Sequence, residues 1–352
     1  MVKSRGLADD QLSKTIQAMP KIDLHRHLEG SVRIDTLVNV AKEYGIPLAD
    51  YSVEGLRPFV QLMPDETRNW QHFLSKFHVL RRFYQSPDII RQFTREVVAD
   101  AAADNVKYLE LRFTPQALCN ETGCSLFDAV DWVCQSSAEA AVRYDIQVGL
   151  ILSMNRHEKV EIGEQVVEAA LSHRDRGVVG LDLAGQEPGH SALPFVPLFQ
   201  QAKAAGLSIT IHAGEWGGAE NVREAIDSLG ADRIGHGVRA MEDPDLLIEL
   251  AERQIVMELC PTSNVDSGVV ANHSVHPLPQ MFRQKLRTTI NTDDPLISNI
   301  TLSDEFALAV RHMDFTLDDL KQQTLVAANA AFLPDAERAA LVARFENWLT
   351  AF

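Results

Sequence analysis

Eight short runs of aliphatic and β-branched residues recur along this chain, and stretches with helical patterning separate most of them. The runs lie at 22–27, 108–113, 148–153, 178–185, 208–213, 233–237, 255–260 and 288–293. Several are apolar nearly throughout, as expected for parallel strands that are buried on both faces. Eight β-then-α units predict an α/β fold and, within that class, a (β/α)8 TIM barrel.

Helical patterns are expected at 164–177, 220–230, 243–254, 301–313 and 333–352. The first two stop at Gly177 and Gly230, and the third opens with Asp243 and Pro244, a capping residue followed by a residue favoured in the first turn. An open doubly wound sheet is the alternative architecture. The first strand is not followed by the glycine-rich phosphate-binding pattern of such sheets, which favours the barrel.

One connection is far too long for a simple barrel unit. Residues 28–107 separate the first two strands and include an aromatic-rich helical stretch at 69–84. Insertions after barrel strands lie over the C-terminal face, where active sites form, so we interpret this one as a helical lid or pocket wall. An ordinary extra helical layer is the alternative. With no internal repeat or linker, residues 1–352 are predicted to form a single domain.

Composition excludes some functions. The formal net charge of −16 repels polyanions such as duplex DNA, which argues against a nucleic-acid partner. The chain has no CxxC pair, which favours a reducing compartment. Its cysteines are Cys119, Cys124, Cys134 and Cys260. We find neither a signal-peptide core in residues 1–14 nor an apolar stretch that could span a membrane, and we therefore expect a cytoplasmic protein.

Residues with metal-binding or catalytic chemistry stand at four of the strand ends. The segments are IDLHRHLEG, SITIHAGE, RIGHG and TTINTDDP. His25 and His27 alternate on one strand and so point to the same side, although an isolated HxH is more often a packing or surface feature. Strands one and eight of a closed barrel are neighbours, and strand five faces them. His212 and Asp293 can therefore join the pair around one divalent metal ion.

The remaining polar residues suggest hydrolysis at that ion. Bound Zn²⁺ lowers the pKa of water, so that hydroxide forms near neutral pH. Glu215, three residues after His212, is placed to move protons rather than to bind metal; a helix cap or surface residue is the alternative. His236 could orient the hydroxide or take its proton, or it could be a structural histidine. Asp294 can face substrate while Asp293 faces metal.

The segments MPKIDLHRHLEGS, LDLAGQE, HAGE, GHG and NTDDP together resemble the adenosine deaminase family of the amidohydrolase superfamily, over nearly the whole chain. The resemblance implies one zinc ion held by His25, His27, His212 and Asp293. No lysine stands at the end of the fourth strand, where binuclear relatives carry a bridging carboxylated lysine. The HxE and PCxxC pattern of the other zinc deaminases is also missing.

The same resemblance implies roles for the catalytic and substrate-binding residues. Glu215 would donate a proton to purine N1, and His236 would orient the attacking hydroxide. Asp294 would hydrogen-bond N7, and the backbone amide of Gly185 would hydrogen-bond N3. A glycine at this strand end admits a ligand close to the backbone, although glycines also end strands for steric reasons.

Substrate identity depends on one departure from the family pattern. Glu29 stands where adenosine deaminases usually carry Asp, at a position associated with the ribose 5′-hydroxyl, and family members that act on free adenine tend to have Glu there. LRFTP (111–115) and LDLAG instead resemble the adenosine branch, and Phe73, Leu74 and Phe77 resemble the apolar helix that covers the ribose.

The implied reaction is hydrolytic deamination of adenosine or 2′-deoxyadenosine to inosine or 2′-deoxyinosine and ammonia. Adenine or a 5′- or N6-substituted adenosine is the alternative substrate. A metal-dependent ester or lactam hydrolase and a zinc-holding protein without catalysis are the rivals from other functional classes.

Overall fold

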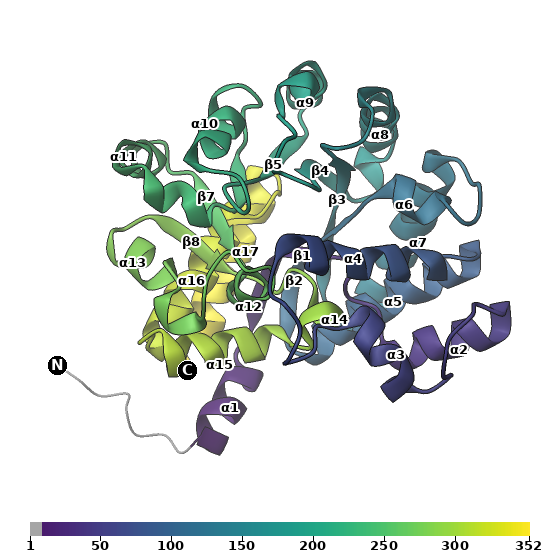
Figure 1. The fold of residues 1–352 in the computed structure, drawn as a ribbon. Coiled ribbons are helices and arrows are strands. Elements are labelled where there is room, and N and C mark those ends of the chain that lie inside the picture. The colour runs from purple at the N-terminus through teal and green to yellow at the C-terminus, as the bar shows by residue number, and fades with distance from the viewer. Residues whose placement is uncertain (1–8) are drawn as a thin grey trace.

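The structure, a computed structural model, describes residues 9–352, so the first eight residues of the segment 1–14 lie outside it. Eight parallel strands form one sheet in the order β1 to β8, with helices around it (Figure 1), which confirms the predicted barrel. The strands are β1 (Lys21–His27), β2 (Val106–Phe113), β3 (Gln147–Asn155), β4 (Val178–Ala184), β5 (Ser208–Ala213), β6 (Arg233–His236), β7 (Val256–Leu259) and β8 (Arg287–Ile290).

The chain just after β8 closes the barrel. β8 ends at Ile290, earlier than the predicted 293. Asp293 then pairs with β1: its N–H donates to the carbonyl of His25 at 2.8 Å, and its carbonyl accepts from the N–H of His27 at 2.9 Å. This pairing brings the Asp293 side chain beside the two histidines of β1, although it lies more than 260 residues away along the chain.

The helices up to β4 are α1 (Asp9–Ala18), α2 (Ile34–Tyr44), α3 (Val53–Val60), α4 (Trp70–Leu80), η1 (Arg81–Phe83), α5 (Pro87–Ala103), α6 (Pro115–Cys119), α7 (Leu126–Tyr144), α8 (Val160–Ser172) and η2 (Arg174–Arg176). The helix predicted at 164–177 thus ends at Ser172. A 3₁₀ turn follows, and Gly177 then takes a left-handed φ of +98°.

The later helices are η3 (Leu193–Phe195), α9 (Val196–Ala204), α10 (Ala219–Asp227), η4 (Val238–Glu242), α11 (Pro244–Glu252), α12 (Pro261–Asp266), η5 (His273–Val275), α13 (Leu278–Arg283), α14 (Pro295–Ser298), α15 (Leu302–His312), α16 (Leu317–Ala330) and α17 (Asp335–Leu349). Asp243 caps α11 as predicted, because its carboxylate accepts the N–H groups of Asp245 and Leu246.

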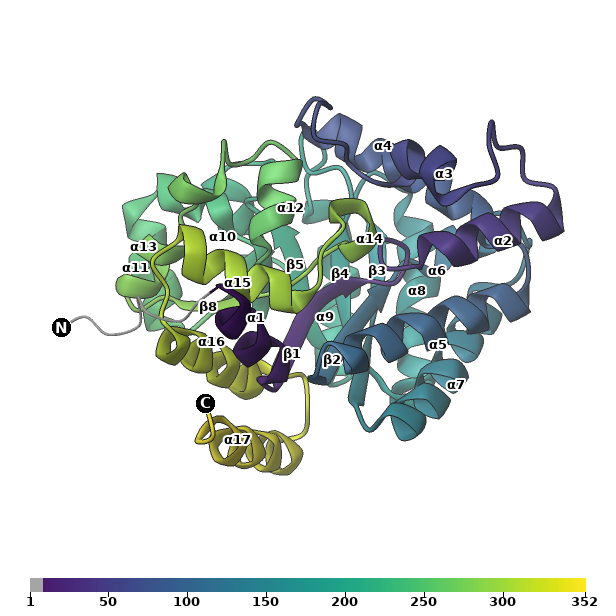
Figure 2. The same ribbon diagram turned by 90° about the horizontal axis from the view of Figure 1, so that it is seen from below.

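The insertion predicted at 28–107 divides into two parts. α5 packs against β2 and α7 and is therefore a helix of the outer ring. The prediction that all of 28–107 forms a lid does not hold for this part. α3 and α4 lie at one end of the barrel, opposite α17 (Figure 2). Lys76 of α4 ties these two helices together, since its ammonium group donates to the Pro58 carbonyl at 2.7 Å. No helix within residues 9–352 is long and apolar enough to cross a membrane.

Candidate active site

A cavity of about 440 Å³ opens at the C-terminal ends of the strands. Polar walls come from the strand ends, and α4 contributes the aromatic side chains of Trp70, Phe73 and Phe77. The predicted site residues that line it are His27, Glu29, Phe73, Phe77, Gly185, His212, Glu215, His236, Asp293 and Asp294. His25 is fully buried behind them. All of the predicted residues therefore gather at one place.

The four predicted metal ligands turn their terminal atoms toward one point. Nε2 of His212 lies 3.1 Å from Nε2 of His25 and 3.3 Å from Nε2 of His27. Oδ1 of Asp293 lies 3.3 Å and 3.4 Å from those same two Nε2 atoms. Four tetrahedral ligands at roughly 2.0–2.1 Å from a zinc ion stand about 3.3 Å apart, so these spacings fit such an ion.

Two buried carboxylates orient the ligand imidazoles. Glu258 accepts from Nδ1 of His25 at 2.8 Å, and Asp182 accepts from Nδ1 of His212 at 2.9 Å. With the proton on Nδ1, the Nε2 lone pair of each ring is free to bind a metal. These carboxylates thus select the tautomer that metal ligation requires.

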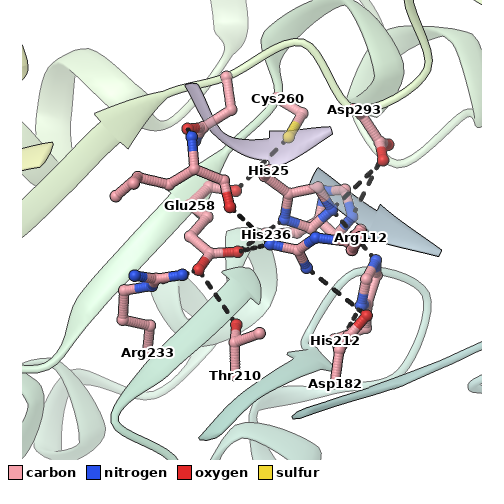
Figure 3. A network of polar contacts seen from close by, with 12 residues as sticks. His25, Arg112, Asp182, Thr210, His212, Arg233, His236, Glu258, Cys260 and Asp293 are labelled. Carbon is pink, nitrogen blue, oxygen red and sulfur yellow. Dashed lines mark hydrogen bonds and ion pairs between the residues drawn. The ribbon is translucent and has the colours of Figure 1, made fainter. Parts of the chain in front are cut away.

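Glu258 is in turn compensated by two arginines (Figure 3). Its carboxylate lies 2.7 Å from Nη2 of Arg112 and 2.6 Å from Nε of Arg233, and all three side chains are buried. Burial opposes ionisation, but the two guanidinium groups hold the pKa of Glu258 well below its ordinary range. Ionised Glu258 can therefore remain behind His25 without protonation.

His236 is a geometric rival to His27, because ligand atoms of His25, His212, His236 and Asp293 all lie within 4.8 Å of one another. Its hydrogen bonds argue against ligation. Nδ1 of His236 lies 3.1 Å from Nδ2 of Asn264, and Oδ1 of Asn264 lies 3.2 Å from Nε2 of His276.

A backbone donor fixes the direction of this relay. The N–H of Leu278 donates to Nδ1 of His276, and burial lowers the pKa of His276 to about 3, so this neutral ring carries its proton on Nε2. Nε2 of His276 then donates to Asn264, and the Asn264 amide donates to Nδ1 of His236. Burial also lowers the pKa of His236, so its own proton lies on Nε2 and no lone pair there is free for metal. We therefore favour His27 as the fourth ligand.

Glu215 lies beside the predicted ligands. Its Oε2 is 3.6 Å from Nε2 of His236, and only 3% of the residue is exposed. Burial raises the pKa of Glu215 well above its ordinary value, and the charges of Asp293 and Glu187 raise it further. The carboxylic acid form, which can donate a proton, is favoured in this environment.

The adjacent aspartates lie in different surroundings. Oδ2 of Asp293 accepts a hydrogen bond from Oγ of Ser263 at 2.6 Å. The backbone of Asp293 has an unusual positive φ of 62°. Asp294 instead lines the cavity, and its buried Oδ1 has no hydrogen-bond partner among the described residues. Gly30 makes room for it, since a Cβ there would stand 1.8 Å from that oxygen. Burial and the charge of Asp293 raise the pKa of Asp294.

Two further predicted residues border the cavity away from the ligands. Oε1 of Glu29 accepts the N–H of Thr114 at 2.9 Å, whereas its buried Oε2 has no partner in the described part of the chain. Gly185 has a φ of +83°, and a Cβ there would stand 2.7 Å from Nδ1 of His157. Any other residue at this position would be strained and would crowd the wall.

Several residues of the site were missed by sequence reasoning. Asp182 and Glu258 each lie inside an otherwise apolar strand, and a lone charge in such a run is the signal that could have found them. Arg112 shares β2 with Lys107 and Glu110, so no such signal marks it. Asn264 and His276 lie on α12 and in a loop, and no local pattern connects them to His236. Their proximity is a product of the fold.

The chain was compared with known proteins. The family model described as adenosine deaminase matches residues 20–348. An adenosine deaminase of Clostridium botulinum (strain 657 / Type Ba4) is 36% identical over 314 residues, which cover 89% of this chain and 94% of the relative. The chain therefore belongs to the adenosine deaminase family and is a deaminase hydrolase.

Solved structures agree in fold and differ in substrate. An adenine deaminase from Arthrobacter aurescens has a TM-score of 0.87 at 29% identity and covers 95% of this chain and 100% of its own. An amidohydrolase from Burkhoderia ambifaria with bound Zn has a TM-score of 0.87 at 28% identity, with coverages of 100% and 97%. The N6-methyl-AMP deaminase from Arabidopsis thaliana has a TM-score of 0.82 at 30% identity, and the match covers 95% of this chain and 98% of that protein.

Proposed function

We propose that this protein is a deaminase that uses one zinc ion to convert adenosine or 2′-deoxyadenosine to the 6-oxo nucleoside and ammonia. The observation that carries the proposal is the spacing of 3.1–3.4 Å among the terminal atoms of His25, His27, His212 and Asp293, with buried Glu215 beside them. When bound, the metal lowers the pKa of water, so that hydroxide is available near neutral pH.

The chain's own residues supply the other steps. Protonated Glu215 donates its proton to purine N1, which removes the aromaticity of the ring and makes C6 electrophilic. After the hydroxide adds to C6, the Glu215 carboxylate carries the hydroxyl proton to the 6-amino group, which leaves as ammonia while the C6 oxo group forms. His236 donates a hydrogen bond from Nε2 to the attacking oxygen and so orients it, while the proton stays on the ring. Because Nε2 already carries a proton, this assignment replaces the alternative in which His236 acts as the base.

Other residues of the cavity wall recognise the purine and its N9 substituent. N7 is a hydrogen-bond acceptor, so Asp294 binds it as the protonated acid. The Gly185 amide binds N3. The rings of Phe73 and Phe77 on α4 cover the N9 substituent. Neither ring can form a conventional hydrogen bond, so both contribute apolar contacts only.

Glu29 carries the choice between nucleoside and base. Its buried, unpartnered Oε2 needs a donor from the ligand, which the 5′-hydroxyl of a nucleoside or N9–H of free adenine can supply. LDLAG and the aromatic face of α4 favour the nucleoside. Glu29 and the similarity to an adenine deaminase favour adenine as the second candidate substrate.

A spectrophotometric panel tests the proposal. We expect kcat/KM for adenosine and 2′-deoxyadenosine to exceed that for adenine by up to about 10⁴-fold, because a site built to bind a hydroxyl rejects ligands that lack it. Glu29→Ala should penalise the nucleosides more than adenine. Faster turnover of adenine, or of 5′- or N6-substituted adenosines, would replace the proposed substrate. A cytoplasmic location stays a prediction.

A further inference from the structure

Glu187 is a buried carboxylate that contacts neither the predicted metal ligands nor the cavity, and the proposed mechanism uses only the effect of its charge on the pKa of Glu215. It follows β4 in the segment LDLAGQE, and only 2% of the residue is exposed. Among the described residues, no arginine, lysine or histidine forms an ion pair with it. A buried charge of this kind needs strong hydrogen-bond compensation.

Five N–H donors converge on this carboxylate. Oε1 accepts from the backbone N–H of Gly214 at 2.7 Å and from Nδ2 of Asn221 at 2.9 Å. Oε2 accepts from the N–H groups of Glu215, Trp216 and Gly217 at 3.1, 2.7 and 2.8 Å. Four successive residues thus turn their N–H groups toward one side chain, as in the anion-binding nests of other proteins.

We propose that Glu187 is a positioning residue for Glu215. The four N–H groups of residues 214–217 all donate to the Glu187 carboxylate, and these bonds fix the conformation of the loop. Because Glu215 is part of that loop, Glu187 fixes the position of Glu215. Glu187 also lies two residues after Gly185. One short segment therefore presents an amide to the N3 edge of the purine and fixes the acid at the N1 edge.

The variant Glu187→Gln tests this role with little change in shape. An amide has one acceptor oxygen, so its NH2 group would face N–H donors in either orientation, and the loop would shift. Glu224→Gln is the matched control. Glu224 of α10 accepts the N–H of Ala192 from the segment after β4. Like the bond from Asn221 to Glu187, this contact joins α10 to that segment, but it does not involve residues 214–217.

Hydrogen exchange gives a readout that does not require activity. In Glu187→Gln, the backbone amides of 214–217 should exchange at least about 10-fold faster than in wild type, because these N–H groups lose a buried acceptor. Metal content should be unchanged. Glu224→Gln should leave exchange at 214–217 unchanged. Unchanged exchange in Glu187→Gln would overturn the proposal.

A double-mutant cycle on adenosine separates positioning from general destabilisation. In the wild-type background, we expect Glu187→Gln to lower kcat about 10–100-fold and to leave KM within about 3-fold. In a Glu215→Gln background, the same substitution should change kcat less than about 3-fold. Chromatography of the inosine formed measures turnover in both backgrounds. Equal losses in both backgrounds would overturn the proposal. If the Gln variant does not fold, Glu187→Asp, which keeps the charge but shortens the reach, enters the same cycle with a smaller expected loss.

This inference rests on the proposed function through Glu215. Wild-type protein that turns over no purine would contradict the proposed function. Active wild-type protein with a wild-type kcat in folded Glu187→Gln would contradict only the role of Glu187.

Discussion

At the scale of single residues, neighbouring groups with the same chemistry are given different tasks by their hydrogen bonds. His25 and His212 donate from Nδ1 to carboxylates, whereas His236 accepts at Nδ1 from Asn264. In the proposed mechanism, the first two rings therefore offer a lone pair to a metal, and the third donates a hydrogen bond to the attacking oxygen. Asp293 and Asp294 are divided by their surroundings, because Asp293 faces the histidines and Ser263 whereas Asp294 faces the cavity.

The aspartate pair provides a direct prediction. Asp293→Ala should lose metal, because a carboxylate ligand is removed from the cluster. Asp294→Ala should keep metal and lose kcat/KM for adenosine by about 10²-fold or more, since N7 loses its partner. Elemental analysis of the two purified variants checks this. A metal-free Asp294→Ala beside a fully loaded Asp293→Ala would reverse the assignment.

The relay behind His236 provides a second prediction. Asn264→Asp has no N–H to donate, so Nδ1 of His236 must carry the proton and the ring presents a lone pair to the site. We expect kcat to fall about 10²-fold with little change in KM. His276→Gln, which keeps an N–H donor for Asn264, is the control and should stay within about 3-fold of wild type. Normal turnover by Asn264→Asp would refute the tautomer assignment.

At the scale of elements, the strand ends do the positioning and the helices brace them. Glu305 of α15 is one such brace, because its Oε1 accepts the N–H of Thr262, in α12, at 3.0 Å. Only 1% of Glu305 is exposed, and its Oε2 has no partner in the described chain. Burial raises its pKa from 4.5 to about 8, against the lowering effect of the Thr262 N–H group.

A stability prediction follows from the sign of that shift. The folded state binds this proton more tightly than the unfolded state, so the free energy of unfolding falls as pH rises from 4.5 towards about 8. Glu305→Gln does not titrate and should lose less stability over that window, by up to a few kcal/mol. Urea unfolding at both ends of the window measures the difference. Equal slopes for the two proteins would mean that Glu305 does not carry the shift.

At the scale of the whole molecule, the predicted metal ligands come from β1, β5 and the chain after β8. β1 and the chain after β8 meet where the barrel closes, and β5 faces them across the barrel. Metal binding should therefore stabilise the closed barrel. Most of the core does not depend on the ion, because the apolar side chains between strands and helices pack against one another.

Metal removal tests this coupling. Dialysis against a chelator should abolish turnover and lower the Tm by several degrees, while far-ultraviolet circular dichroism keeps its native shape. Added Zn²⁺ should restore both. His236→Ala, which removes no predicted ligand, should show the same chelator-dependent shift in Tm as wild type. An unchanged Tm with full loss of turnover would mean that the ion contributes no stability.

The sequence by itself determined the fold class, the predicted metal ligands and many of the residues that face the cavity, but not the other buried residues behind them. Strands buried on both faces read as apolar runs, and helices between them keep their own period, so the eight units were visible locally. The histidines and carboxylates stood at the ends of those runs, and the order of strands in a barrel was enough to expect His25, His212 and Asp293 at one place.

Tertiary structure alone decided how each residue is used. The end of β8 at Ile290, and the pairing of Asp293 with β1, depend on backbone contacts across the whole chain. The ring tautomers depend on Glu258, Asp182 and the Asn264 relay, whose partners are distant in sequence. Hydrogen-bond direction and pKa are set by what surrounds a group in space, and a linear pattern carries no record of those neighbours.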